Sequence, residues 1–206
     1  MTRNFALLAI LGASWGILET QIGTTLHALS IPFTGALMMS IGILFLIAGR
    51  YFTGIRGSSF FLAFSAGFVK FLFVGGIAFN PVLGIFIQTT LFEFVLWARW
   101  PSKKRYALAG ALVICYSLFH PFFTQGLLGG WKIVAVYAKI ISSGSGILGL
   151  NERLGFTIFF ALIVLHAGIG VAAALASYNF VEKLERRGIL KKTYAKEKHA
   201  LQEPIN

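Results

Sequence analysis

The chain has 206 residues, of which 57% are hydrophobic and only 12% are charged. Soluble domains have about 25% charged residues, so this composition excludes an ordinary soluble protein and indicates an all-α polytopic membrane protein. The net charge of +11 does not indicate nucleic-acid binding, because the basic residues cluster in short connections and in the C-terminal tail, as on a cytoplasmic membrane face.

Six apolar segments reach the length of about 20 residues that a membrane-spanning helix needs. They predict transmembrane helices over about 5–29, 32–52, 58–79, 81–100, 105–129 and 154–179. We interpret residues 1–180 as one six-helix membrane domain and residues 181–206 as a basic cytoplasmic tail. No segment has the alternating pattern of a transmembrane barrel.

The distribution of Lys and Arg predicts the orientation. If the N-terminus is inside, the inner connections and the tail hold fourteen of the eighteen basic residues. Short loops rich in Lys and Arg remain in the cytoplasm. The sequence therefore predicts a multi-pass protein of the cytoplasmic membrane with both termini inside.

The connection 130–152 is the longest, and it is predicted to lie outside. Its first half is apolar and places Lys132 and Lys139 on one face of any helix. The run "SSGSG" at 142–146 then interrupts the pattern. A surface helix followed by a flexible hinge and a simple spacer both fit this segment.

The first segment carries small and polar residues on one helix face, at spacings of three or four. They are Ala9, Gly12, Gly16, Glu19, Gly23 and His27. The small residues lie in the inner half and allow another backbone to approach closely. The outer half of the same face is polar.

Lys70 lies in the middle of the apolar run "AGFVKFLFVGG". A lysine at the bilayer centre costs about 2.5–3.5 kcal/mol, so a partner is expected. Glu19 lies at nearly the same predicted depth, and Glu93 lies deeper on the inner side. An ion pair with either carboxylate, contact with a ligand's negative charge, and snorkelling to the surface remain open at this point.

Further polar residues fall in the predicted outer half of the membrane domain. His27 and His120 lie there, where a pocket would also collect Asn80 and Gln125, and Gln88 is on the fourth segment. The histidines lack the short spacing of a metal site. Nucleotide-binding and hydrolase motifs are missing, and the chain contains no Asp. We therefore expect neither enzymatic activity nor a cofactor.

Residues 5–179 resemble the substrate-binding S components of energy-coupling factor (ECF) transporters in size, helix number and topology. The family's first helix carries an A-x-x-x-A motif, which Ala9 and Ala13 match within "AILGA". The resemblance implies capture of a vitamin or related micronutrient on the outer side. It also implies two kinds of partner, a transmembrane T component and a pair of ATPases, which fits the missing Walker motif.

The resemblance further implies that the small residues of the first segment form the partner-docking surface: Ala9, Gly12, Ala13 and Gly16. Polar groups near the outer ends of the first, third, fourth, fifth and sixth segments would line the pocket, and the loop 130–152 would close over it. The expected substrate-binding residues are Glu19, His27, Lys70, Asn80, Gln88, His120 and Gln125.

Two other classes of function fit the sequence. One is a membrane subunit or assembly factor that binds no ligand, in which a Lys70–Glu19 pair is purely structural. The other is an autonomous channel, carrier or membrane enzyme. A secondary carrier often contains inverted repeats, and residues 5–79 and 81–179 do not resemble each other.

Overall fold

The computed structural model describes residues 2–74, 79–97 and 101–192, and every regular element within them is a helix. The elements are α1 (Thr2–Ala28), α2 (Thr34–Thr53), α3 (Ser58–Val74), α4 (Phe79–Val95), α5 (Lys103–Pro121), the π-helix η2 (Phe122–Leu128), α6 (Ile133–Leu148), the 3-10 turn η3 (Glu152–Leu154) and α7 (Gly155–Arg186). The prediction of an all-helical fold is confirmed for this part of the chain.

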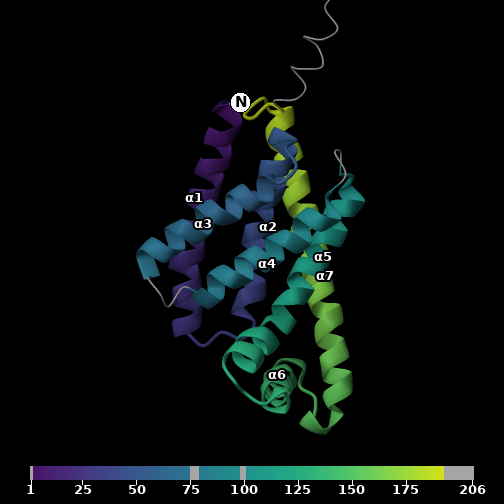
Figure 1. Ribbon diagram of the computed structural model, residues 1–206. Helices are drawn as coiled ribbons and strands as arrows, with labels where there is room; N and C mark the ends of the chain where they lie inside the picture. Colours follow the sequence, from purple (N-terminus) through teal and green to yellow (C-terminus); the bar gives the residue numbers. More distant parts are fainter. Residues whose placement is uncertain (1, 75–78, 98–100, 193–206) are drawn as a thin grey trace, which may run out of the picture.

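The helices form one elongated bundle around α2, which contacts α1, α3, α5 and α7. In Figure 1, α1, α2 and α7 run along the length of the molecule and α3 and α4 cross it obliquely. The start of α1 and the end of α7 lie together at one end, here called the terminal end. The short helix α6 lies at the opposite end, here called the cavity end.

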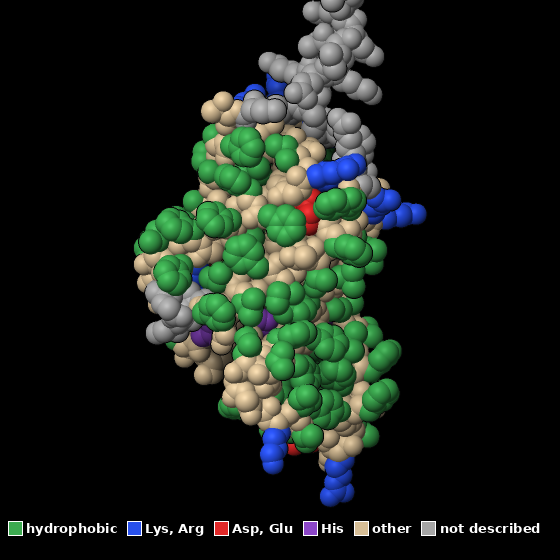
Figure 2. Space-filling view, in the orientation of Figure 1, with side chains coloured by type: hydrophobic (Ala, Val, Ile, Leu, Met, Phe, Trp, Pro, Cys, Tyr) green, Lys and Arg blue, Asp and Glu red, His purple; other side chains and the backbone are tan. Residues whose placement is uncertain are grey.

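Four helical stretches are long and apolar enough to cross a membrane: α1, α2, α5 with η2, and η3 with α7. Helices α3 and α4 have 17 residues each, or about 26 Å at 1.5 Å per residue, against about 30 Å for the hydrocarbon core. The predicted segments 58–79 and 81–100 include residues 75–78 and 98–100, which lie outside the described residues. Figure 2 shows apolar side chains over most of the visible face between the two ends, as a membrane-embedded protein requires.

Glycines set the closest helix contacts. Helices α5 and α7 meet at Gly110 and Gly170, where a Cβ on Gly110 would lie 2.3 Å from the carbonyl oxygen of Gly170. Helices α1 and α3 meet at Gly16, where a Cβ would lie 2.7 Å from the oxygen of Ala66. The predicted close approach of a backbone to the small residues of the first segment is confirmed.

Helix α6 differs from the expectation for 130–152. It continues through "SSGSG" to Leu148 and is followed by Gly149, whose φ is 65°, so the predicted break is wrong. The reason is tertiary: Gly144 faces Ile158 and Leu162, where a Cβ would lie 2.7–2.8 Å from their side chains. A glycine in mid-helix is stabilised here by the contact that its missing side chain permits.

Helix α7 extends beyond the predicted boundary at residue 180. It ends at Arg186, because Val181 is fully buried in the core and Tyr51 of α2 donates a hydrogen bond to Glu185. Residues 181–186 therefore belong to the bundle. Of the predicted tail, residues 193–206 lie outside the described residues.

Candidate functional site

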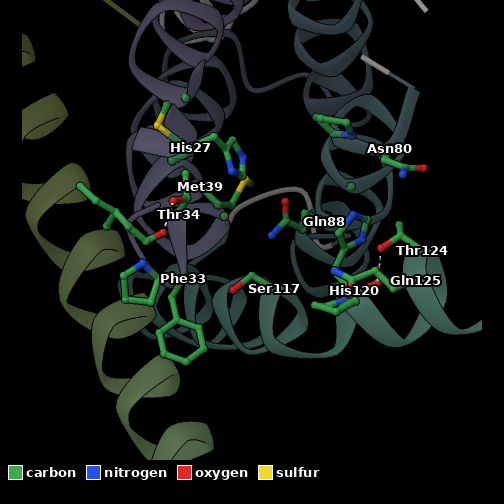
Figure 3. Close-up of a pocket in the computed structure, with 18 of the residues that line it drawn as sticks. His27, Phe33, Thr34, Met39, Asn80, Gln88, Ser117, His120, Thr124 and Gln125 are labelled. Carbon is green, nitrogen blue, oxygen red and sulfur yellow. Dashed lines mark hydrogen bonds between the residues drawn. The ribbon is translucent and has the colours of Figure 1, made fainter. Parts of the chain in front are cut away.

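A cavity of about 580 Å³ opens at the cavity end of the bundle. Its walls come from α1 to α5, η2, α6 and the connection between α1 and α2, and Figure 3 shows side chains from several of these elements turned toward it. Among the described residues, none from α7 lines it. The expectation that the sixth predicted segment contributes to the pocket is therefore wrong, and α2 contributes instead.

The Lys70–Glu19 ion pair borders this cavity. The Lys70 ammonium donates to Glu19 Oε1 at 2.9 Å, and the two side chains are 8% and 11% exposed. The close contact of α1 and α3 at Gly16 and Ala66 explains the pairing, since Glu19 and Lys70 each follow by about one turn toward the cavity end. The cost of burying either charge is offset by its partner.

Glu93 takes no part in this pair. Its Oε1 accepts a hydrogen bond from the Gly57 N–H at 2.7 Å and lies 3.4 Å from Arg50. Arg50 and Glu93 are both about 1% exposed. The alternative in which Glu93 pairs with Lys70 is wrong. Glu93 lies in the last turn of α4, beside the α2–α3 connection, where Gly57 and Arg50 are its partners.

The π-helix η2 places two polar side chains in the cavity. Pro121 has no backbone N–H, so the hydrogen-bonding pattern of α5 cannot continue unchanged past it, and a π-helix follows. The hydroxyl of Thr124 donates to the carbonyl of His120 at 3.2 Å. Thr124, Gln125 and His120 all line the cavity, which fits the frequent occurrence of π-helical turns at functional sites.

The connection between α1 and α2 is strained where it lines the cavity. Ser30 and Phe33 have φ values of 53° and 55°, which non-glycine residues seldom adopt. Such strain persists only where surrounding contacts hold it. Here the Phe33 ring packs edge-on against His166 of α7, with centroids 5.0 Å apart. His166 itself is buried behind Phe33 and donates from Nδ1 to the carbonyl of Leu162.

The seven residues expected to bind substrate all line this one cavity: Glu19, His27, Lys70, Asn80, Gln88, His120 and Gln125. Gln88 is buried, His120 and Gln125 are half-buried, and His27 and Asn80 are exposed at the mouth. The geometry brings them together from α1, α3, α4, α5 and η2.

Sequence reasoning missed the contribution of α2 and the α1–α2 connection. Phe33, Thr34, Met38 and Met39 line the cavity, but methionines in an apolar helix look like ordinary core residues. The only sequence signal for this part of the wall was Pro32, which marks a turn between the first two predicted helices. From α6, Lys139 and Ser143 reach the cavity mouth, so the connection 130–152 borders the site as a helix.

The expected docking surface on α1 is only partly accessible. Gly12 and Gly16 are buried against α3, so they cannot contact another protein as well. Ala9 is exposed and Ala13 is half-buried. The assignment of Gly12 and Gly16 to partner docking is therefore corrected: they hold α1 and α3 together.

Comparison with models of known protein families, with curated proteins and with solved structures finds no match.

Proposed function

We propose that this protein is the substrate-binding S component of an ECF-type importer in the cytoplasmic membrane. In this function it captures a small micronutrient or vitamin-like molecule on the outer side. A transmembrane T component and two ATPase subunits then complete transport. The observation that supports the proposal best is the single cavity into which seven polar side chains converge from separate helices.

The cavity has the size and chemistry of a small-molecule site. Its volume of about 580 Å³ lies within the range of about 300–1,000 Å³ typical of ligand pockets. Ionisable residues at membrane depth mark substrate or ion pathways, and Lys70 and Glu19 border this space. The cavity lies at the end opposite the start of α1 and the end of α7, so it would face outside if both termini are cytoplasmic.

With Gly12 and Gly16 buried against α3, the proposed contact surface for the T component consists of Ala9 and Ala13. Both lie on α1, and small side chains there allow close approach by a helix of the partner. Neighbouring Ile10 is 65% exposed, so this part of α1 is open to lipid or protein.

A second candidate function is a membrane subunit that binds no ligand. The Lys70–Glu19 contact favours it, because each charge already has a partner within the chain. In that case the ion pair contributes to stability alone.

Native mass spectrometry of the protein, gently purified from its own membranes, distinguishes the two functions. The S-component function predicts a stoichiometric small molecule bound to the chain, and larger assemblies that contain ATPase subunits. A ligand-free chain in a stable complex with another membrane protein, without ATPases, would instead support the structural subunit.

A further inference from the structure

The hydroxyl groups within the cavity share one property: each donates its proton to a backbone carbonyl nearby in the chain. The bonds run from Thr34 to Ile31 at 2.6 Å, from Ser117 to Ile114 at 2.6 Å and from Thr124 to His120 at 3.2 Å. A hydroxyl has one proton and two lone pairs. With that proton engaged, each of these three oxygens offers lone pairs to a molecule in the cavity.

Two glutamine side chains add further acceptors. Gln88 donates through Nε2 to the carbonyl of Val113 at 3.3 Å, which leaves its amide oxygen as an acceptor. Gln125 lines the cavity, and its Oε1 is buried without a hydrogen-bond partner among the described residues. An unsatisfied buried acceptor is costly, so a ligand that donates to Gln125 gains that free energy back.

The charges of the cavity balance one another. Lys70 and Glu19 are hydrogen-bonded at 2.9 Å, so a charged ligand would have to break this pair or remain without a counter-charge inside the cavity. Lys139 is exposed at the mouth, with its ammonium 5.5 Å from the centre of the Trp131 ring. The interior therefore favours an uncharged molecule.

The remaining walls are apolar. Phe33, Met38, Met39 and Ile85 line the same space, and methionines adapt their shape to flat surfaces. Donor groups are also present: the hydroxyls of Ser30 and Ser143 lie at the exposed mouth, and the side-chain amides of Gln88 and Gln125 carry N–H groups. The interior thus combines apolar surface with several lone pairs and a few amide donors.

From these observations we propose that the cavity binds an uncharged molecule with several N–H or O–H donors on a flat apolar frame, such as an amino-substituted aromatic heterocycle. This inference rests on the proposed function and names the ligand class of its site. Donors on the ligand would meet Thr34, Ser117, Thr124, Gln88 and Gln125, and the ring would pack against the methionines.

The test compares two probes that share a ring and carry either amino groups, which donate hydrogen bonds, or methoxy groups, which do not. They are 2,4-diaminopyrimidine and 2,4-dimethoxypyrimidine, at an alkaline pH at which both are uncharged. Ligand-observed saturation-transfer NMR with the purified full chain in detergent should detect the diamino probe, and its affinity should exceed that of the dimethoxy probe by about tenfold or more, as expected for loss of one or two hydrogen bonds. Equal binding, preference for the dimethoxy probe, or binding of neither would overturn the inference.

Matched variants locate the binding. Gln125→Leu removes an interior acceptor and should weaken binding of the diamino probe by about tenfold. Ser142→Ala, at an exposed position of α6 outside the cavity lining, should leave it unchanged. If Gln125→Leu fails to fold, Thr34→Val serves in its place. Undiminished binding to a folded interior variant would contradict the proposed site.

Native mass spectrometry separates this inference from the proposed function. A co-purified ligand that lacks N–H and O–H donors, or that carries a net charge, overturns the ligand class and leaves the S-component function standing. A ligand-free chain that binds neither probe contradicts both.

Discussion

Two buried ion pairs lie at opposite ends of this bundle and differ in what surrounds them. Near the terminal end, Arg50 and Glu93 are almost fully enclosed, and backbone groups complete their hydrogen bonds: Arg50 donates to the carbonyl of Leu96 at 3.0 Å, and Gly57 N–H donates to Glu93. At the cavity end, Lys70 and Glu19 bond to each other and border an open space.

The difference shows that burial of a charge does not by itself identify a functional site. The Arg50–Glu93 pair ties α2 to α4 and to the α2–α3 connection, and both side chains are enclosed by the bundle. The Lys70–Glu19 pair joins α1 to α3 and retains an accessible side. The first is therefore expected to serve stability, and the second can serve both stability and binding.

The largest effect is expected from Glu93→Gln. This change leaves the Arg50 charge buried without its carboxylate, which costs about 3–5 kcal/mol of folding free energy. Reversible unfolding in mixed micelles, followed by circular dichroism, measures the loss. Glu152→Gln, at an exposed position of η3, is the control and should unfold like the parent. A Glu93→Gln protein of parental stability would refute the structural role of this pair.

A second test compares glycines in the two regions. In Gly170→Ala the new Cβ would lie 2.2 Å from the Gly110 oxygen, and such overpacking costs about 1–3 kcal/mol or more. In Gly84→Ala the Cβ would lie 3.1 Å from the His120 ring, which can move into the cavity, so a smaller loss is expected. The same unfolding assay measures both.

Gly168→Ala is the control for the glycine pair, because a Cβ there meets nothing within 4 Å. Equal losses for Gly84→Ala and Gly170→Ala would contradict the view that the cavity end tolerates added volume.

Glu19→Gln should destabilise the protein by about 1–3 kcal/mol, less than Glu93→Gln, because water in the cavity can solvate the Lys70 ammonium. Under the proposed function it should also abolish capture of the native ligand. Combining it with Lys70→Met should recover most of the stability without restoring capture. A loss as large as that of Glu93→Gln would show that the two pairs do not differ.

The smallest effect on folding is expected from Ala13→Leu and Ala9→Leu. Ala9 is exposed and Ala13 is half-buried, so stability should change by no more than about 0.5 kcal/mol. Under the proposed function, co-purification with a T component and ATPases should nevertheless be lost, and Ile10→Leu should retain it. Intact assembly of both alanine variants would exclude this surface as the docking site.

The sequence alone was sufficient to predict the helical class, the membrane character and most helix positions. These features depend on composition and on the length of apolar runs, which are local properties. It also predicted which polar residues border the cavity, because Glu19, Lys70, Gln88 and Gln125 are rare polar positions within apolar segments. A membrane-depth charge needs a partner wherever it lies, so its importance is visible without a fold.

Only the tertiary structure determined which charged side chains form ion pairs and which helices line the cavity. It paired Glu19 with Lys70, because the contact of α1 with α3 brings these two residues to the same depth. It paired Glu93 of α4 with Arg50 of α2 in the same way, through the packing of their helices. It brought α2 into the cavity, and it kept α6 helical through "SSGSG" by packing Gly144 on α7. Each of these outcomes depends on the distance between segments remote in sequence, and an apolar pattern specifies burial without specifying the neighbour.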